Sequence, residues 1–349
     1  MNSRERVLAA FAHEEPDRVP AWCGSSAEFW AKAKRELSIA GDEDLRIRFG
    51  DDFRRVWARY AGPPVQLAPG ATSRTPFGVD RHGMGYGQPM NHPLAGATLA
   101  QVHDYPWPDP KWMDVSGIRA EALKWGSQYA VLGGEWSPFW HDAIDLMGME
   151  ELYILMYDAP DVVDALMRHM VDYYVEVSRR IFDAAAGAID IFFIGNDLGG
   201  QTGPLLSPAL FERFILPPLA RLIDLGHAYG LKVMLHCCGG FVPLVPAMIA
   251  AGLDGLQAVQ PSCAGMSLPK LKSAFGDKIL FNGAIDSHHV LINGTPPLVR
   301  VKTREVLDIM MPGGGYVAGA SHDSILEETP VENVLAMFDT VREDGQYGK

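Results

Sequence analysis

The sequence contains only four cysteines, Cys23, Cys237, Cys238 and Cys263, and two of them are adjacent. Adjacent cysteines do not suit a disulfide framework, and the count is low for a secreted, disulfide-stabilised scaffold. We therefore expect free thiols in a reducing compartment, which predicts a cytoplasmic protein.

Long apolar runs and clusters of basic residues are also missing. No stretch reaches the roughly 18 to 20 apolar residues that a membrane span needs, and the charged segment 1–19 does not resemble a signal peptide. The formal net charge is −13, with acidic residues spread along the chain. A nucleic acid or an anionic membrane would require a clustered basic face, so neither is expected as a partner.

What is present is a regular alternation of short apolar runs, rich in β-branched residues, with longer helical patterns. The predicted strands are residues 129–133, 189–194, 232–235, 255–259, 279–282 and 316–319. The helical patterns between them are residues 162–186, 207–230, 241–251, 268–275, 297–311 and 330–344. Such repeated βα units indicate a parallel sheet flanked by helices.

The amino-terminal third is less regular. Helical patterns cover residues 3–13, 27–37 and 44–49, and an extended segment is expected at 18–20. Residues 62–112 are rich in glycine, proline and aromatic residues, which indicates an elaborated loop or lid.

These patterns together predict one domain over residues 1–349, an α/β fold of the (β/α)8 TIM barrel type with an N-terminal helical elaboration. A doubly wound open sheet is the second choice. No G-x-G-x-x-G follows an early strand, so the dinucleotide-binding fingerprint is absent.

Polar residues follow the predicted strands where each strand ends. In a barrel these positions face the active site. In strand order the residues are Glu135; Asn196, Asp197 and Gln201; His236 and Cys238; Gln260 and Cys263; Asn282 and Asp286; Ser321, His322 and Asp323. Polar residues placed by chance in six loops would rarely give this set. The set therefore supports both the predicted fold and the predicted site.

His236 and Cys238 are two residues apart at a strand end, so both side chains can point to the same face. One nitrogen and one sulfur donor held close together suit zinc. Alternatively, Cys238 is a packed apolar residue and His236 a hydrogen-bonded strand end. Cys237 is expected to point toward the helices and to belong to the core.

The roles of the neighbouring residues stay open at this point. His322 could be a ligand, a general acid, a substrate hydrogen-bonding group or an exposed loop residue. Asp197 lies near glycines that let a ligand approach the backbone, or it is a turn residue. Glu135 could bind a metal or the backbone, and Trp136 could contact a flat apolar ligand or the core. Asp52 is either a turn feature or a residue that reaches the pocket.

Several short motifs carry a family likeness. They are Arg4-Glu5-Arg6-Val7-Leu8, Pro16-Asp17-Arg18-Val19-Pro20, Leu206-Ser207-Pro208, His236-Cys237-Cys238-Gly239, Asn282-Gly283-Ala284-Ile285-Asp286, Gly313-Gly314-Gly315-Tyr316 and the tail from Ser321-His322 to Val334. Through them the chain resembles the uroporphyrinogen decarboxylase-like superfamily nearly end to end. The resemblance implies a (β/α)8 barrel with a deep cleft at the carboxyl ends of the strands.

One branch of this superfamily comprises the uroporphyrinogen decarboxylases proper, which carry an arginine-rich motif after the first Pro-x-Trp. Here Pro20-Ala21-Trp22 is followed by no arginine until Arg35. Without those guanidinium groups, a substrate with many carboxylates would lose its main charge-assisted hydrogen bonds. However, His322 aligns with a histidine of these enzymes, and Asp52 could replace their central aspartate. A metal-free decarboxylase of a tetrapyrrole or related polycarboxylate is therefore the alternative function.

The other branch comprises zinc-dependent corrinoid methyltransferases, which resemble this chain at His-x-Cys-Gly. Their third zinc ligand is a cysteine near the C-terminus, and His322 stands at the equivalent position. The resemblance implies zinc bound by His236, Cys238 and His322, and a methyl group moving between a small molecule or thiol and a cobamide.

This methyltransferase is the main functional prediction, with Asp197 as a further catalytic residue. The residues expected to bind the substrate are Gln201, Gln260, Asn282, Trp136 and Glu135. A separate corrinoid protein and a homodimer are the macromolecular partners that the resemblance suggests. A carrier that binds a corrinoid or tetrapyrrole without turnover is less favoured, because a carrier does not need converging His, Cys and Asp side chains.

Overall fold

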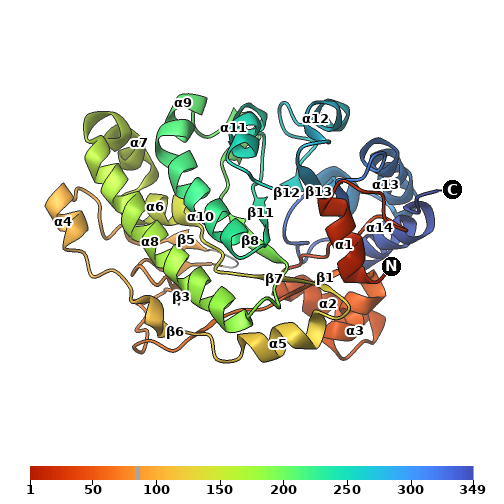
Figure 1. Cartoon of the computed structure of the whole chain (residues 1–349), viewed down its shortest axis with the longest axis horizontal. Coiled ribbons are helices and arrows are strands. Elements are labelled where there is room, and N and C mark those ends of the chain that lie inside the picture. Colours follow the sequence, from red (N-terminus) through yellow and green to blue (C-terminus); the bar gives the residue numbers. More distant parts are fainter. Residues whose placement is uncertain (84–86, 349) are drawn as a thin grey trace.

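The computed structural model describes residues 1–83 and 87–348, and its centre is a parallel sheet surrounded by helices (Figure 1). The sheet has seven strands in the order β1-β7-β8-β11-β12-β13-β14. They are β1 (Phe53–Arg55), β7 (Ala130–Gly133), β8 (Ile191–Gly195), β11 (Lys232–His236), β12 (Gly255–Val259), β13 (Leu280–Ile285) and β14 (Tyr316–Ala320). The predicted α/β class is confirmed.

The two edge strands of this sheet, β1 and β14, are joined by the extended residues 20–22. The backbone N–H of Ala318 donates to the Pro20 carbonyl (2.8 Å), and that of Trp22 donates to the Ala318 carbonyl (2.9 Å). On the other side, the N–H of Asp52 donates to the Ala21 carbonyl (3.0 Å). Residues 20–22 therefore act as an eighth strand that closes the barrel.

Helices cover the outside of the barrel (Figure 1). They are α2 (Ala27–Leu37), α3 (Asp42–Phe49), α5 (Ile118–Trp125), α6 (Phe139–Met147), α7 (Met149–Asp158), α8 (Pro160–Ala185), α10 (Leu216–Ala228), α11 (Val245–Ala250), α12 (Leu268–Phe275), α13 (Pro296–Met310) and α14 (Val331–Asp344), with short turns such as α9 (Pro208–Leu210). Among the described residues, no helix is both long and apolar enough to cross a membrane.

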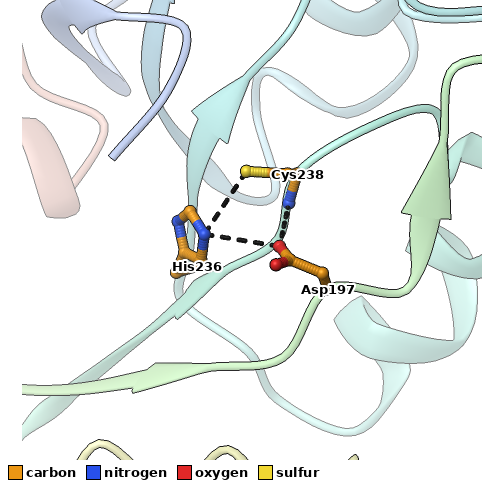
Figure 2. Close-up of side chains that lie close together, drawn as sticks. All are labelled: Asp197, His236 and Cys238. Atoms are coloured by element: carbon orange, nitrogen blue, oxygen red, sulfur yellow. Dashed lines mark hydrogen bonds and ion pairs between the residues drawn. The ribbon is translucent and has the colours of Figure 1, made fainter. Parts of the chain in front are cut away.

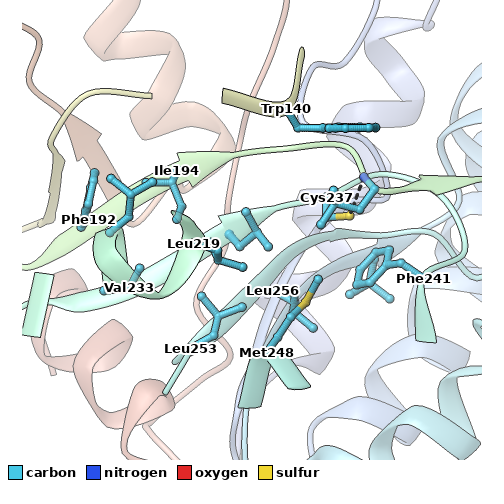
Figure 3. Close-up of a cluster of buried hydrophobic side chains, with 14 of the residues drawn as sticks. Trp140, Phe192, Ile194, Leu219, Val233, Cys237, Phe241, Met248, Leu253 and Leu256 are labelled. Atoms are coloured by element: carbon cyan, nitrogen blue, oxygen red, sulfur yellow. Dashed lines mark hydrogen bonds between the residues drawn. The ribbon is translucent and has the colours of Figure 1, made fainter. Parts of the chain in front are cut away.

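A layer of buried side chains fills the space between strands and helices. Figure 3 shows part of it, where Phe192, Val233 and Leu256 project outward from the sheet and pack against helical residues such as Leu219. Cys237 lies in this layer and is fully buried, as expected from its position between His236 and Cys238. Because side chains alternate along a strand, the residues on either side of Cys237 point into the barrel.

Helix α1 (Ser3–Phe11) fills the barrel interior at the amino ends of the strands. Its Val7, Ala10 and Phe11 belong to one buried cluster with the inward-facing residues Phe53, Ala130, Leu132, Ile191, Phe193, Met234, Leu280 and Val317. Gly255 leaves room for this helix, since a Cβ at that position would lie 3.1 Å from the Phe11 ring. Helix α1 therefore closes the amino end of the barrel interior.

Residues 62–112, expected to form a loop or lid, form an ordered excursion in their described part; residues 84–86 lie outside the described range. It contains β3 (Ser73–Arg74), β4 (Asp80–His82), β5 (Gln88–Pro89) and α4 (Leu99–His103), and β2 (Arg59–Tyr60) pairs with β6 (Met113–Asp114) at its base. Phe77 packs on Tyr173 and Tyr174 of α8, and Arg81 forms an ion pair with Asp145 of α6. These contacts anchor the excursion on two outer helices.

Asp52, predicted as a catalytic residue, lies at the amino end of β1, opposite the carboxyl face of the barrel. Its fully buried carboxylate accepts hydrogen bonds from Arg6 Nη1 (2.9 Å), from both terminal nitrogens of Arg18 (2.9 Å each) and from the N–H of Ala21 (2.8 Å). Asp52 thus connects α1 and the closing segment to β1, and its role is to hold the barrel together.

This role predicts that Asp52→Asn will destabilise the protein by roughly 3–5 kcal/mol, because the substitution leaves two guanidinium groups without their buried partner. Urea unfolding followed by circular dichroism measures the loss. The control is Glu305→Gln, which breaks an exposed ion pair with Lys302 (2.7 Å) and should cost at most about 1 kcal/mol. Equal effects of the two substitutions would contradict the proposed role.

Candidate functional site

Three potential metal ligands meet at the carboxyl ends of two neighbouring strands (Figure 2). His236 is the last residue of β11, Cys238 follows two residues later, and Asp197 lies just after β8. His236 Nε2 is 3.4 Å from Cys238 Sγ and 3.3 Å from Asp197 Oδ1. The three ligand atoms all lie within 4.8 Å of one another.

The imidazole of His236 is oriented by the next strand. Its Nδ1 is 2.5 Å from Oε1 of Gln257 on β12, and Nε2 of Gln257 donates to Asp323 Oδ1 (3.0 Å). Because the amide nitrogen of Gln257 is used by Asp323, its oxygen must accept from Nδ1–H of His236. Nε2 therefore faces Cys238 and Asp197 and would offer its lone pair to a metal once its own proton has left, as in metal sites whose histidines donate through the second ring nitrogen.

Asp197 is fixed through both carboxylate oxygens. Oδ1 accepts a hydrogen bond from the N–H of Cys238 (2.7 Å), and Oδ2 is 3.2 Å from Nε2 of His141 on α6. The loop of Asp197 packs tightly on the loop of Cys238: a Cβ at Gly199 would lie 2.6 Å from the Cys238 carbonyl oxygen, and one at Gly239 would lie 2.4 Å from the Gly199 carbonyl carbon. Only glycine permits this approach.

Burial and mutual interactions shift the pKa values of all three groups. Burial alone would raise the pKa of Asp197, but hydrogen bonds from His141 and His236 hold it well below its usual range, so the carboxylate is ionised at neutral pH. Burial alone would lower the pKa of His236, but Cys238, Asp197 and Asp323 raise it well above its usual value. Burial raises the pKa of the Cys238 thiol. A proton on His236 and another on Cys238 must leave when a cation binds.

This donor set fits a zinc ion. In a tetrahedral site, bonds of about 2.0–2.1 Å to nitrogen and oxygen and about 2.3 Å to sulfur put neighbouring ligand atoms roughly 3.3–3.6 Å apart. The distances from His236 Nε2 to Cys238 Sγ and to Asp197 Oδ1 are of this size. Three protein ligands would leave one coordination position open, which is the arrangement of catalytic rather than structural zinc sites.

A cavity of about 480 Å³ lies at the same end of the barrel, and Asp197, His236 and Cys238 are not among its lining residues. The loops after β8, β12, β13 and β14 line it, and they contribute Gln201, Gln260, Cys263, Asp286 and His322. Gln260 forms a shared wall, because its Oε1 accepts the N–H of Gly239, the residue after Cys238 (2.7 Å). This volume lies within the roughly 300–1,000 Å³ typical of small-molecule pockets.

His322 lies in the wall of this cavity and is not part of the three-residue cluster. Its Nδ1 is 2.9 Å from the Ser324 carbonyl oxygen and 3.2 Å from the Ser324 nitrogen, so the ring is held by its own loop. The structure thus brings Asp197, rather than His322, beside His236 and Cys238. His322 remains placed to contact a substrate in the cavity.

The other residues expected to bind the substrate lie at different positions relative to the three-residue cluster. Trp136 packs beside His236, with ring centroids 5.5 Å apart, over Gly195, where a Cβ would collide with the indole at 1.9 Å. Glu135 faces Arg55, and burial raises the pKa of its carboxyl to about 7. Asn282 lies within β13 because that strand runs to Ile285, and its Nδ2 is 3.9 Å from Met234 Sδ, below the cluster.

Two residues that orient the cluster were not singled out from the sequence, namely Gln257 and His141. A signal for Gln257 existed, because it is a polar residue at an inward position of the otherwise apolar run Gly255–Val259. His141 had no such signal, since it follows Trp140 on a helix and its position beside Asp197 depends on how that helix packs.

The chain is similar to known proteins along most of its length. The family model described as uroporphyrinogen decarboxylase (URO-D) matches residues 98–344. A uroporphyrinogen decarboxylase of Syntrophotalea carbinolica is 28% identical over 54% of this chain and 50% of its own length. A methylated-thiol–coenzyme M methyltransferase of Methanosarcina mazei is 24% identical over 74% of this chain and 71% of its own.

A methylcobamide:CoM methyltransferase, MtbA, of Methanosarcina acetivorans is 21% identical over 58% of each chain. The chain spans about half the length of the uroporphyrinogen decarboxylases that it matches. Among solved structures, a methyltransferase from Methanosarcina mazei superposes with a TM-score of 0.65 at 21% identity, covering 98% of this chain and 99% of the other, which supports the same fold. Because the family model matches most of its length, this chain belongs to the uroporphyrinogen decarboxylase (URO-D) family.

Proposed function

We propose that this chain is a methyltransferase that uses a zinc site formed by Asp197, His236 and Cys238 to move a methyl group between a small molecule or thiol and a cobamide. The observation that carries this proposal is the nitrogen, sulfur and oxygen donor set, with His236 Nε2 3.4 Å and 3.3 Å from the other two ligand atoms. A metal bound there would stabilise a thiolate or another anionic nucleophile by Lewis-acid interaction.

The names of two relatives support methyl transfer as the reaction. Two of them carry names that state methyl transfer to coenzyme M, and one of these names a methylcobamide. We therefore propose a cobamide as co-substrate and a separate corrinoid protein as the partner that presents it. The four cysteines are all unpaired, which agrees with the reducing, cytoplasmic setting that we propose.

The residues around the cluster have distinct tasks in this proposal. Gln257 holds the Nδ1–H of His236 in a hydrogen bond, which leaves Nε2 as the nitrogen that would bind the metal. His141 holds the second oxygen of Asp197, which fixes the direction of the carboxylate. Gln260 and His322 line the cavity beside the cluster and would hold the polar part of the methyl donor or acceptor.

The alternative, metal-free decarboxylation of a polycarboxylate, is less well supported by the geometry. It would use an aspartate to stabilise a cationic intermediate, and Asp52 and Asp197 are the two candidates for that role. The carboxylate of Asp52 is buried among Arg6 and Arg18 at the amino ends of the strands. Asp197, the remaining candidate, is engaged by Cys238 and His141. Relatives with the decarboxylase name still make carbon dioxide release from uroporphyrinogen a necessary control assay.

The ligand set makes a prediction about metal content. The wild-type protein, purified without chelator, should contain close to one zinc per chain by mass spectrometry, and Asp197→Ala or Cys238→Ala should lose it. His322→Ala should keep the metal, because His322 is outside the cluster. Cys263→Ala is the matched control, since it removes a cavity-lining thiol that is also outside the cluster.

Two results would count against this assignment. Zinc retained in Cys238→Ala would show that the cluster does not hold the metal. Zinc lost in His322→Ala but kept in Asp197→Ala would show that His322, in the loop after β14, is the third ligand instead of Asp197.

A second prediction concerns Gln257. Replacing Gln257 by Leu removes the acceptor for Nδ1–H of His236 and should weaken zinc affinity by about 10–100-fold, measured by competition with a chromogenic chelator. Gln201→Leu, at another cavity-lining position, should leave zinc affinity unchanged and instead reduce methyl transfer from methylcobalamin to a thiol. Similar zinc affinities of Gln257→Leu and the wild type would contradict the orienting role of Gln257.

A further inference from the structure

The loop after β14 is linked to the metal cluster although Asp323 in this loop is not one of the three residues whose ligand atoms meet. Oδ1 of Asp323 accepts a hydrogen bond from Nε2 of Gln257 (3.0 Å). Oε1 of the same Gln257 is 2.5 Å from Nδ1 of His236. Asp323 is therefore joined to a proposed metal ligand through a single side chain.

Burial differs along this chain of hydrogen bonds. His236 is 6% exposed and Gln257 is fully buried, whereas Asp323 is half-buried and lines a cavity of about 190 Å³. A fully buried amide needs protein partners for its oxygen and its nitrogen, because bulk water does not reach them. The side chains at its two ends therefore determine how the amide of Gln257 is oriented.

Two orientations of this amide have nearly the same shape, since oxygen and nitrogen differ little in size. In one, the oxygen of Gln257 accepts from Nδ1–H of His236 and the nitrogen donates to Asp323. In the other, turned by half a rotation, the nitrogen donates to Nδ1. The ring proton of a neutral His236 would then be on Nε2, the atom that faces Cys238 and Asp197, and would block a metal there.

The carboxylate of Asp323 excludes the second orientation. A carboxylate accepts hydrogen bonds and does not donate them. Turning the amide of Gln257 would place its oxygen against Oδ1 of Asp323, at the position where a hydrogen bond of 3.0 Å now forms. The turned amide would thus lose a hydrogen bond to a charged group and gain a repulsive contact.

The backbone around Asp323 is itself fixed. The N–H of Ile325 donates to the Gly24 carbonyl (3.0 Å), and the N–H of Ser26 donates to the Ile325 carbonyl (3.0 Å). A Cβ at Gly24 would lie 1.8 Å from the Asp323 carbonyl oxygen, so only glycine permits this approach. Residues 24–26, which follow the closing segment, thus hold the loop that carries the carboxylate.

We propose that Asp323 is a positioning residue for His236. By accepting the amide hydrogen of Gln257, it keeps the amide oxygen on Nδ1–H of the imidazole. Nε2 is then the ring nitrogen left for a metal shared with Cys238 and Asp197. The orientation of the amide is a property of the metal-free protein, whereas its consequence for zinc rests on the proposed function.

The first test uses the metal-free protein. Heteronuclear NMR of protein with isotope-labelled histidine follows the exchange of the Nδ1 proton of His236 with solvent, and the signal is identified by its absence in His236→Asn. Asp323→Leu should speed this exchange by at least about ten-fold, because the amide of Gln257 loses the group that orients it. Glu328→Gln, which removes an exposed carboxylate from the same loop, should leave the exchange unchanged.

The second test measures zinc affinity by competition with a chromogenic chelator. Asp323→Leu should weaken the affinity by about 10–100-fold, as for other groups that orient a metal ligand, and Glu328→Gln should bind zinc like the wild type.

A double variant, Gln257→Glu with Asp323→Asn, reverses donor and acceptor. The side chain at position 257 then presents only oxygens to His236, and the amide at position 323 can donate to it. This variant should bind zinc at least about ten-fold more tightly than Asp323→Leu. A role of Asp323 in folding alone would not be restored in this way, and the rescue also protects the test if Asp323→Leu is poorly folded.

Unchanged exchange of the Nδ1 proton in Asp323→Leu would overturn the proposal. So would a double variant that binds zinc as weakly as Asp323→Leu while the wild type binds it tightly. A wild type that binds no zinc, but whose Nδ1 proton is protected only while Asp323 is present, would refute the zinc site of the proposed function and uphold the positioning role of Asp323.

Discussion

The buried carboxylate of Asp52 is the interaction on which the barrel depends. It accepts hydrogen bonds from Arg6 in α1, from Arg18 and from the backbone of Ala21, and Asp52 itself directly precedes β1. One acidic side chain thereby connects the helix that fills the barrel, the segment that closes it and the first strand of the sheet. Such a group is stable in the interior only while all of its partners are present, because burying a charge without them is costly.

The closed amino end determines where chemistry can take place. With α1 filling that end, a ligand approaches the polar cluster at the carboxyl ends of β8 and β11 from the opposite side. There the arrangement depends on backbone as much as on side chains: Gly199 and Gly239 let two loops approach until Asp197 can accept the N–H of Cys238. A larger residue at either glycine would move the carboxylate away from His236. The donor set is therefore a property of the loop packing.

Much of this could be predicted from the sequence, and the limits have physical causes. Strand and helix positions follow from local periodicity, so most elements were expected within a few residues. The placing of His236 and Cys238 on one face follows from alternation along a strand, which is also local. The third member of the cluster is not local: Asp197 rather than His322 lies there because of the geometry between β8 and β11. The position of Asp52 could not be predicted because no strand was expected at residues 53–55, so the amino end of β1 that Asp52 occupies was not recognised.

The closing segment also has a consequence for how the chain acquires its structure. Residues 20–22 are synthesised long before β14, which is one of their two neighbours in the sheet. Until that strand is synthesised, the sheet has two open edges, and unpaired edges invite pairing with other chains. Contacts between such distant parts of a sequence also form slowly. The nascent protein is therefore expected to pass through an aggregation-prone open sheet until β14 is made.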